Sequence, residues 1–367
     1  MRLSVGSILG DAGGAEAVVP VLKLLEQRKT LAGTWAAGPA QQVLSREGVP
    51  YRPLSEMTPG AMIDLAHPTV LLTGTSWAEQ PPELEYIEAA CRAGVPVLSV
   101  VAFSSKYTAR FLGSDGRLIL PDRIAVPDDV AVAEAVAEGL PAERLMATGN
   151  PHYEVLLRHG QGFDRDARMA FREQVGVPRK ATLVLFASQP IRALYGSRLG
   201  YDEDQVVSLV RDGVDSVADW LGHGITLAVR SHPRQEGGAR LPEGTPKVSV
   251  RRADQGEPLS WILAADLVVG MSSALLLQAG LLGLRVVSVQ PGLVGIDNVP
   301  SNRMGLSESV VDVAGVGPAL YRVLARPAHL GSAREVQRLR LHSSGAAMRL
   351  LNLVVDMGAR DLSEVHA

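Results

Sequence analysis

The chain has 367 residues, of which 46% are hydrophobic and 4% aromatic, and single hydrophobic cores usually stop growing near ~250 residues, so two domains are expected. The formal net charge of −3 excludes a basic field that would draw nucleic acid or an anionic membrane surface, which leaves a small molecule as the expected partner. The single cysteine, Cys91, excludes an internal disulfide and a cysteine-based zinc cluster, and its helical setting EAACRAG predicts a small buried side chain.

The amino-terminal segment MRLSVGSILGDAGG carries one arginine and a short apolar run that ends at Gly10-Asp11. The run is too brief for a signal peptide and suits a first strand, so we expect a cytoplasmic protein. The uncharged stretch 267–284 is long enough to cross a bilayer, but glycines and polar residues divide it into a strand and a helix. No integral membrane segment is therefore predicted.

Strands and helices alternate along the whole chain, which predicts parallel sheets flanked by helices. The strands expected in the first half are Leu3–Leu9, Val70–Thr73, Val95–Val101, Arg123–Val126 and Leu145–Thr148, with helices after the first of them and over Leu84–Ala93. The strands expected in the second half are Thr182–Ala187, Thr226–Arg230, Val248–Val250, Leu267–Val269 and Val286–Val289. The helices expected there are Phe163–Val175, Gln205–Leu221, and one or two over Ser332–Asp356.

The segment 265–291, ADLVVGMSSALLLQAGLLGLRVVSVQP, has the pattern of a strand, a polar turn, an apolar helix and a second strand. Ser272 and Ser273 follow Gly270 at the helix start, where serine side chains cap free backbone N–H groups. Those N–H groups and the helix dipole form a candidate anion site, with phosphate as the expected guest. An ordinary capped helix would give the same pattern, so both interpretations stay open from this segment alone.

The two halves share one layout, which predicts an α/β protein with two Rossmann-like, doubly wound domains facing a central cleft. The boundaries expected are an amino-terminal domain over 1–155, a second domain over 156–345, and a carboxyl-terminal helix over 346–367 that could pack back on the first domain. Ligands of such domains bind at the carboxyl ends of the strands. Hydroxyls, amides, glycines and one histidine gather there, in GDAGG (10–14), TGTS (73–76), SSK (104–106), SQP (188–190), RSHP (230–233) and MSS (271–273).

Several of these motifs resemble those of one enzyme superfamily. RSHPR at 230–234, followed by ADLVVGMSSALLLQAGLLGLRVVSV, is similar to the carboxyl-terminal half of GT-B-fold, sugar-nucleotide-dependent glycosyltransferases and of the non-hydrolysing UDP-N-acetylglucosamine 2-epimerases. TGTSW at 73–77, KYTARF at 106–111 and ATGNPHYEVL at 147–156 resemble bacterial polysaccharide-type members. The resemblance covers nearly the whole chain and implies the GT-B fold more firmly than any one reaction.

In the second domain, the resemblance implies that Ser272 and Ser273 hold a nucleotide diphosphate. His232 would face the same diphosphate and donate a hydrogen bond or a proton as the phosphate departs. Gln189 lies where GT-B enzymes often touch the nucleotide, and Arg192 could bind phosphate in a bidentate manner. The full nucleotide-binding set expected is Ser188, Gln189, Arg192, Arg230, His232, Met271, Ser272, Ser273 and Gln278.

The chain also departs from the superfamily pattern. Gln278 stands where many relatives carry a glutamate that binds both ribose hydroxyls, so the nucleotide base stays open. The 2-epimerases usually show a double glycine and paired glutamates in this helix, whereas this chain has Ser273-Ala274 and Gln278-Ala279. Ala102 lies near a strand end where similar polysaccharide-type sequences tend to carry an aspartate.

Glycosyl transfer with inversion needs a base for the acceptor proton, which GT-B enzymes usually supply from the first domain. Asp11 is the first candidate and Glu79 the reserve, although Asp11 could simply cap the following helix. His232 completes the catalytic set. The residues expected to contact acceptor or sugar are Gly13, Gly14, Thr75, Ser76, Lys106, Asp297 and Asn298. No aspartate pair with metal-ligand spacing stands out near them, so no metal is predicted.

The function expected is that of a glycosyltransferase moving a sugar from a nucleotide-diphosphate donor to an acceptor hydroxyl or similar nucleophile. The alternatives are a non-hydrolysing UDP-sugar 2-epimerase or sugar-nucleotide hydrolase, and a non-catalytic relative that binds a nucleotide or a partner. The substrates would be a nucleotide-sugar, UDP-linked, and a small-molecule or glycan acceptor, with no cofactor. An alanine-, glycine- and arginine-rich composition fits a high-GC bacterium, where such enzymes serve polysaccharide or secondary-metabolite biosynthesis. Whether the chain forms a homodimer stays open.

Overall fold

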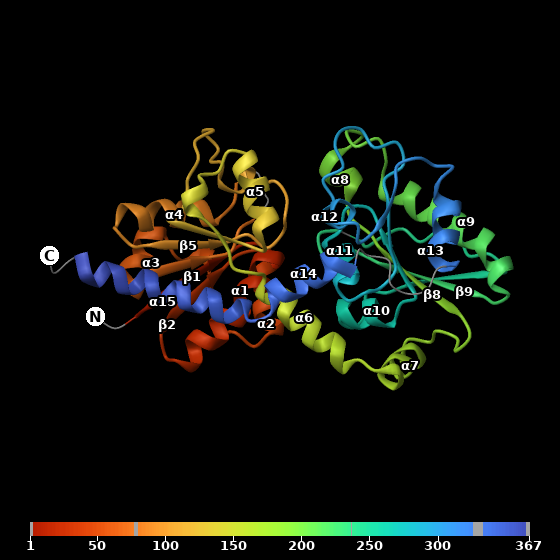
Figure 1. Cartoon of the computed structure of the whole chain (residues 1–367), viewed down its shortest axis with the longest axis horizontal. Helices are drawn as coiled ribbons and strands as arrows, with labels where there is room; N and C mark the ends of the chain where they lie inside the picture. Colours follow the sequence, from red (N-terminus) through yellow and green to blue (C-terminus); the bar gives the residue numbers. More distant parts are fainter. Residues whose placement is uncertain (1–2, 77–79, 236, 326–332, 365–367) are drawn as a thin grey trace. The chain divides into compact units, whose positions relative to one another are not determined.

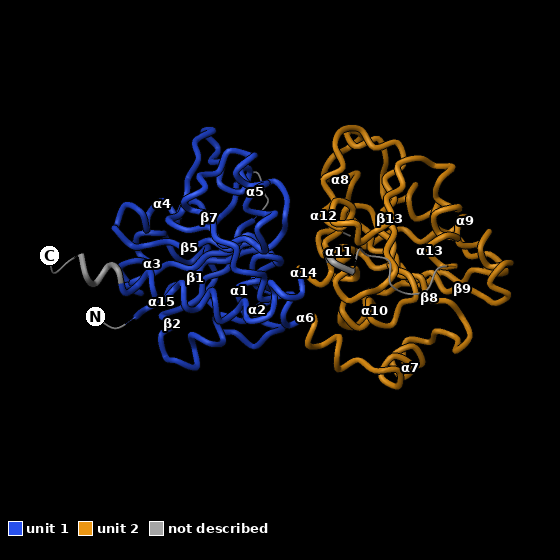
Figure 2. The backbone as a smooth tube through the Cα atoms, viewed as in Figure 1, with its two compact units in different colours: residues 1–155, 339–367 blue, residues 156–338 orange. Residues whose placement is uncertain are grey.

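The computed structural model describes residues 3–76, 80–235, 237–325 and 333–364 (Figure 1). The contacts within the chain divide it into two compact units (Figure 2). Unit 1 comprises residues 1–155 and 339–367, and unit 2 comprises residues 156–338. The chain therefore leaves unit 1 once and returns to it near its carboxyl terminus.

Unit 1 is built on a seven-stranded parallel sheet of order β3-β2-β1-β4-β5-β6-β7. Its strands are β1 (Val5–Leu9), β2 (Leu31–Ala36), β3 (Arg52–Pro53), β4 (Val70–Thr73), β5 (Val97–Val100), β6 (Arg123–Val126) and β7 (Leu145–Ala147). Its helices are α1 (Ala12–Gln27), α2 (Pro39–Arg46), η1 (Leu54–Glu56), α3 (Pro59–Ala66), α4 (Glu83–Arg92), η2 (Thr108–Phe111), α5 (Asp129–Ala137), η3 (Ala142–Arg144) and α15 (Ala346–Glu364). Two further helices, α6 (Pro151–Gly162) and α14 (Ala333–Ser343), run across the boundaries between the units.

Successive strand residues of unit 1 face opposite sides of the sheet, as the period of a β-strand requires. Val70 and Leu72 belong to a core that includes residues of α1, α2 and α15, whereas Leu71 belongs to one that includes residues of α3, α4 and α5. Both faces are therefore covered by helices, which is why the strands are continuous apolar runs.

Helix α15 packs on unit 1. Leu350, Leu351 and Val354 are fully buried in the core that contains β1 and α1. Close packing extends to Gly358, where a Cβ atom would lie 2.6 Å from Leu3 Cδ1. The carboxyl-terminal helix thus completes one face of the first sheet.

Unit 2 is built on a six-stranded parallel sheet of order β10-β9-β8-β11-β12-β13. This is the 3-2-1-4-5-6 order of a Rossmann domain. Its strands are β8 (Thr182–Ala187), β9 (Ile225–Arg230), β10 (Val248–Arg252), β11 (Leu267–Gly270), β12 (Val286–Val289) and β13 (Glu308–Val310). Its helices are α7 (Arg165–Gln174), α8 (Ile191–Tyr195), α9 (Glu203–Leu221), α10 (Pro258–Ala264), α11 (Ala274–Leu281), α12 (Pro300–Arg303) and α13 (Val316–Ala325).

The second sheet is also covered on both faces. Val184 and Phe186 pack in a core with α9 and α13, whereas Leu183 and Leu185 pack in one with α10 and α11. The two parallel sheets with flanking helices confirm the predicted fold class of two Rossmann-like α/β domains.

Some local features differ from the sequence analysis. Cys91 is exposed, so the expectation of a buried cysteine was wrong. The inward face of α4 is formed instead by Leu84, Ile87 and Ala90, and Cys91 lies beside that stripe. The pattern also did not single out α6, which begins at Pro151, where Asn150 Oδ1 accepts the His152 backbone N–H at 2.9 Å.

Candidate functional site

The strand order of each sheet reverses between its first and fourth strands, and ligands of such sheets bind just outside the carboxyl ends of the strands at that point. In unit 1 the reversal lies between β1 and β4, and in unit 2 between β8 and β11. The loops that follow these four strands are therefore the first places to look for a site.

In unit 2 a hydrogen-bonded bridge joins the two loops at the reversal. Gln189, after β8, accepts at Oε1 from the backbone N–H of Ser272 at 2.8 Å and from its hydroxyl at 3.2 Å. Both residues are half-buried. Because Ser272 supplies two donors to one atom, the amide group is oriented with its oxygen on Ser272 and its NH₂ group directed away from it.

The amino terminus of α11 follows directly. Ser273 is the N-cap, and its hydroxyl oxygen accepts the Leu275 N–H at 3.2 Å. Ala274, the first residue of the helix, is exposed. The backbone around this cap combines N–H groups with the positive end of the helix dipole, an arrangement suited to an anion.

The loop after β9 is held in a defined conformation. The Ser231 N–H and hydroxyl donate to the two carboxylate oxygens of Asp254, at 2.8 and 3.0 Å. The next residue, His232, accepts the Arg234 backbone N–H at Nδ1, at 3.1 Å. A neutral His232 therefore carries its proton on Nε2, the form that can donate a hydrogen bond from that atom.

Four of the expected nucleotide-binding side chains are buried or are paired within the protein. Met271 is fully buried in the core, and Ser188 is buried with no hydrogen-bond partner for its hydroxyl among the described residues. Arg230 donates to the carbonyls of Ala253 and Gly256, and burial lowers the pKa of its guanidinium. Arg192 is exposed and forms ion pairs with Asp202 and Asp204.

The residues expected to contact sugar in unit 2 form hydrogen bonds with residues close to them in the chain. Asp297 accepts the Val299 N–H at 3.0 Å and an Asn302 side-chain N–H at 2.8 Å. Burial opposes its ionised form, but these hydrogen bonds outweigh that effect and lower its pKa. Asn298 donates to the Ile296 carbonyl. Gln278 lies half-buried on α11.

In unit 1 the reversal is packed so tightly that only glycines fit. A Cβ atom on Gly14 would lie 3.2 Å from Gly74 Cα, which places the first turn of α1 against the loop after β4. A Cβ atom on Gly10 would lie 2.5 Å from Pro82 Cγ and 2.6 Å from Ser76 Oγ. Gly13, by contrast, is exposed and has only Ala102 within 4 Å of an added Cβ.

The side chains expected to bind acceptor in unit 1 point in different directions. Asp11 is half-buried and caps α1, accepting the Ala12 N–H at 2.9 Å. Thr75 and Ser76 are buried, and their hydroxyls donate inward, to the Val100 carbonyl and to a carboxylate. Lys106 is half-buried with φ 53°, and burial lowers the pKa of its ammonium. Glu79, the reserve base, lies outside the described residues.

Two ionisable side chains that the sequence analysis missed complete this region. Glu83, the first residue of α4, is 2% exposed, and burial raises the pKa of its carboxyl. Arg110, in η2, is 7% exposed and donates to the carbonyls of Phe103 and Ser105. An acidic residue in the first turn of a helix is common, so nothing in the sequence marked Glu83 as buried.

The TGNP segment at 148–151, part of the ATGNPHYEVL motif, has a structural explanation. Gly149 has φ 81°, and a Cβ atom there would lie 2.2 Å from the His342 carbonyl oxygen. Asn150 then donates from Nδ2 to the Ala102 carbonyl at 3.0 Å. The motif thus fastens the loop after β5 to the start of α6.

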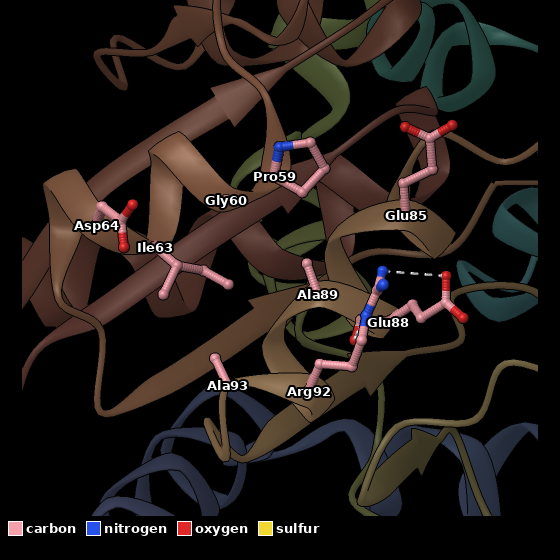
Figure 3. A pocket seen from close by; sticks show the side chains of 9 residues that line it. All are labelled: Pro59, Gly60, Ile63, Asp64, Glu85, Glu88, Ala89, Arg92 and Ala93. Atoms are coloured by element: carbon pink, nitrogen blue, oxygen red, sulfur yellow. Dashed lines mark hydrogen bonds and ion pairs between the residues drawn. The ribbon is translucent and has the colours of Figure 1, made fainter.

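A hollow of about 590 Å³ lies elsewhere in unit 1, between α3 and α4 (Figure 3). It is open to solvent, and its lining includes Asp64, Glu85 and the Glu88–Arg92 ion pair. None of its lining residues is among those expected to bind a ligand. Among the described residues, no cluster of three histidine, cysteine or carboxylate side chains is placed to hold a metal. No described helix has the length and apolar character needed to cross a membrane.

Comparison with solved structures identifies the architecture. The UDP-GlcNAc 2-epimerase from Neisseria meningitidis, bound to UDP-GlcNAc, matches with a TM-score of 0.66 at 11% identity, covering 96% of this chain and 100% of that one. The UDP-GlcNAc 2-epimerase from Methanocaldococcus jannaschii matches with a TM-score of 0.63 at 14% identity, covering 94% and 100%. The glycotransferase of kitacinnamycin matches with a TM-score of 0.59 at 14% identity, covering 97% and 100%. No protein-family model and no curated protein sequence matches the chain. The chain has the GT-B fold, as the sequence resemblance implied.

Proposed function

We propose that the chain is an enzyme that binds a nucleotide-diphosphate sugar, UDP-linked, in unit 2 and changes its sugar. The observation that carries the proposal is the bridge between Gln189 and Ser272 beside the capped amino terminus of α11. It lies at the carboxyl edge of the Rossmann sheet, at the strand reversal, where such sheets take their ligands.

The diphosphate would lie on the backbone N–H groups around Ser273, where the dipole of α11 favours negative charge. Gln189, whose oxygen is already held by Ser272, would direct its NH₂ group to a ligand acceptor. His232 would add a hydrogen bond from Nε2 to a phosphate oxygen and so stabilise charge that develops there. All three contributions are made by groups whose orientation is fixed before the ligand arrives.

Epimerisation at carbon 2 of the sugar is the first reaction to test. Solved structures of UDP-GlcNAc 2-epimerases recur among the similar folds, and each match covers nearly the whole of both chains. The comparisons therefore favour this reaction over glycosyl transfer, which the sequence analysis placed first. Epimerisation removes a proton from a carbon atom and returns it on the opposite face, so it requires acid–base groups at the sugar.

Glycosyl transfer remains the second candidate because of one feature of unit 1. The described parts of the loops after β4 and β5, residues 74–76 and 101–105, contain no carboxylate. Asp11 is the half-buried carboxyl group at the strand reversal, and transfer with inversion needs a single base. The glycotransferase with the same fold is consistent with this alternative.

A matched pair of variants tests the diphosphate site. Ser273→Asp keeps an oxygen that caps α11 but adds a negative charge, and Ser273→Asn keeps a cap of the same shape without the charge. Calorimetry should show that UDP binds the wild type and Ser273→Asn, and that Ser273→Asp loses at least tenfold in affinity through repulsion. Equal affinity of all three proteins for UDP would contradict the assignment of the diphosphate site to the amino terminus of α11.

Incubation with UDP-N-acetylglucosamine then separates the reactions. Conversion to a second sugar nucleotide without any acceptor identifies an epimerase, and incorporation of solvent deuterium at carbon 2 would mark the proton exchange. Release of UDP only when an acceptor mixture is added identifies a transferase. Tight binding of UDP with neither outcome would identify a non-catalytic nucleotide-binding protein and would contradict the enzymatic proposal.

A further inference from the structure

The strand reversal of unit 1 contains a carboxyl group that binds two loops at once. Glu83 Oε1 accepts the backbone N–H of Gly10 at 2.9 Å and the hydroxyl of Ser76 at 2.7 Å. Gly10 belongs to the loop after β1, and Ser76 belongs to the loop after β4. One oxygen atom therefore joins the two loops that flank the reversal.

The second oxygen of the same carboxyl group has no hydrogen-bond partner among the described residues. Glu83 Oε2 is inaccessible to solvent, and an ionised carboxylate in that position would leave a charge buried without a cation on it. Burial raises the pKa of Glu83, the Ser76 hydrogen bond opposes the rise, and the nearby charge of Asp11 adds to it. The carboxyl group therefore makes both of its hydrogen bonds through Oε1.

Arg110 is a buried cation that interacts electrostatically with Glu83. Arg110 acts on Glu83 and Asp11 through space, but the described residues place no carboxylate oxygen within 4.0 Å of its guanidinium. Its N–H groups are directed at main-chain carbonyls instead. Among the charged side chains, Asp11 acts electrostatically on both Glu83 and Arg110, and Glu138 acts on Arg110.

The loop held by Glu83 is the one that carries Asp11. Gly10 and Asp11 are adjacent in the chain, and the space around Gly10 admits no Cβ atom because Pro82, Ser76 and Glu83 fill it. The hydroxyls of Thr75 and Ser76 point inward, whereas the half-buried carboxyl of Asp11 lies directly after Gly10. Fixing the Gly10 amide therefore fixes the backbone from which Asp11 projects.

We propose that Glu83 is a positioning residue, which holds the Asp11 loop against the loop after β4 and so sets the orientation of Asp11 for acid–base work. The catalytic part of this inference rests on the proposed function. Glu83 is too deeply buried to touch a substrate itself, so its effect passes through Gly10 and Ser76. A misplacement of about 1 Å in such a group can cost a rate on the order of 100-fold.

Three variants test the proposal in the full-length chain. Glu83→Ala removes both hydrogen bonds, and Glu83→Gln keeps an uncharged oxygen that can accept them from Gly10 and Ser76. Glu85→Ala is the control, because Glu85 is an exposed glutamate in the same turn of α4. Amide hydrogen exchange should accelerate at least tenfold at Gly10 in Glu83→Ala and stay at the wild-type rate in the other two proteins.

Turnover of UDP-N-acetylglucosamine gives the second readout. We expect kcat to fall on the order of 100-fold in Glu83→Ala with KM and UDP affinity unchanged, and to return to within a few-fold of the wild type in Glu83→Gln. An unchanged Gly10 exchange rate or an unchanged kcat in Glu83→Ala overturns the proposal. Equal loss of kcat in Glu83→Gln overturns it too, because the carboxyl itself would then take part in the reaction.

The two proposals fail in different ways. If the wild type binds no UDP and turns over no sugar nucleotide, the proposed function fails, and hydrogen exchange at Gly10 alone then decides whether Glu83 holds the loop. If Glu83→Ala does not fold, Ser76→Ala removes one of the two hydrogen bonds and should give smaller changes in the same direction.

Discussion

Each unit has a carboxyl group next to its fourth strand, buried Glu83 in unit 1 and half-buried Asp266 in unit 2, and their pKa values are shifted in opposite directions. Asp266, just before β11, accepts from Arg168 at 2.6 Å, from Arg172 at 2.5 Å and from the Leu183 N–H at 2.8 Å. Burial opposes its ionised form, but the arginines and the N–H outweigh burial and lower its pKa. Glu83, beyond the carboxyl end of β4, has a raised pKa and no described cation within 4.0 Å.

The difference separates a structural carboxylate from a functional candidate. Asp266 is at the amino edge of its sheet, away from the ligand edge, and its charge is neutralised by two fixed cations. Glu83 is at the ligand edge of its sheet, and its carboxyl is hydrogen-bonded to two loops instead of being paired with a cation among the described residues. Strongly perturbed pKa values occur both in ion-pair networks and in active sites, so position relative to the strand ends decides which case applies.

Removal of the structural carboxylate should give the largest effect. Asp266→Ala leaves the guanidinium of Arg172, 6% exposed, buried without its partner, so the free energy of unfolding of unit 2 should fall by about 3–5 kcal/mol. Segment-resolved hydrogen exchange measures the two units separately. Asp219→Ala, which breaks an exposed pair with Lys247, is the control and should have no measurable effect. A small effect of Asp266→Ala would mean that the buried pair does not hold α7 to the sheet.

A glycine pair tests how tightly the reversal of unit 1 is packed. Gly10→Ala places a Cβ atom among Pro82, Ser76 and Glu83 and should lower the free energy of unfolding by about 1–3 kcal/mol through overpacking. Gly13→Ala, three residues on, meets only Ala102 at 3.9 Å and should leave stability unchanged or raise it. Urea titrations measure both. Equal stability of the two variants would show that the loop at Gly10 can move aside.

The pH dependence of stability should have opposite signs for the two carboxyl groups. The pKa of Glu83 is raised in the folded state, so the folded chain holds its proton more tightly and stability falls as pH rises from the ordinary value of 4.5 through the raised pKa. The pKa of Asp266 is lowered, so its contribution is present above the ordinary value of 3.8 and is lost as pH falls through the lowered pKa.

Urea titrations at a series of pH values separate these contributions. Glu83→Gln should flatten the fall in stability above pH 4.5 and leave the loss in acid unchanged. Asp266→Asn should remove part of the loss in acid instead. A wild-type curve with the same slope above pH 4.5 as Glu83→Gln would contradict the raised pKa of Glu83.

The smallest effect is expected at the position of unit 2 that corresponds to Gly10. Ser188 follows β8 as Gly10 follows β1, but its buried hydroxyl has no described hydrogen-bond partner. Ser188→Ala should therefore leave the free energy of unfolding within about 0.5 kcal/mol of the wild type or raise it. Ser99→Ala, which removes a buried hydroxyl bonded to Thr73 at 2.7 Å, should cost about 1 kcal/mol and serves as the comparison in the same urea titrations.

The local pattern of the chain determined much of its architecture. Apolar runs such as Thr182–Ala187 and Leu267–Gly270 predicted buried parallel strands because both faces of such strands meet helices. Ser273 was recognised as a helix cap because capping depends on neighbours one to three residues away. The strand ends therefore also located the loops that meet at each reversal.

Side-chain roles within those loops were set by contacts that the sequence does not display. Arg192 is paired with Asp202, about ten residues further on, and Glu83 is bonded to Gly10 across a sequence separation of 73 residues. Hydroxyls such as Thr75 and Ser76 look alike in sequence whether they face a ligand or the protein interior. Only the packing of the loops shows that both point inward.

The sequence by itself determined most strands of the two parallel sheets, though not β2, β3 or β13, together with the helix cap beside the expected diphosphate site and the loops at the ligand edge, because each depends on periodicity or on residues close together in the chain. The tertiary structure alone decided that Glu83 lies buried between two loops, that Gln189 is oriented by Ser272, and that Arg230 and Asp297 serve the protein's own backbone. Those outcomes depend on which distant groups meet, and on the loss of water around them, which gives a buried carboxyl a different proton affinity from an exposed one.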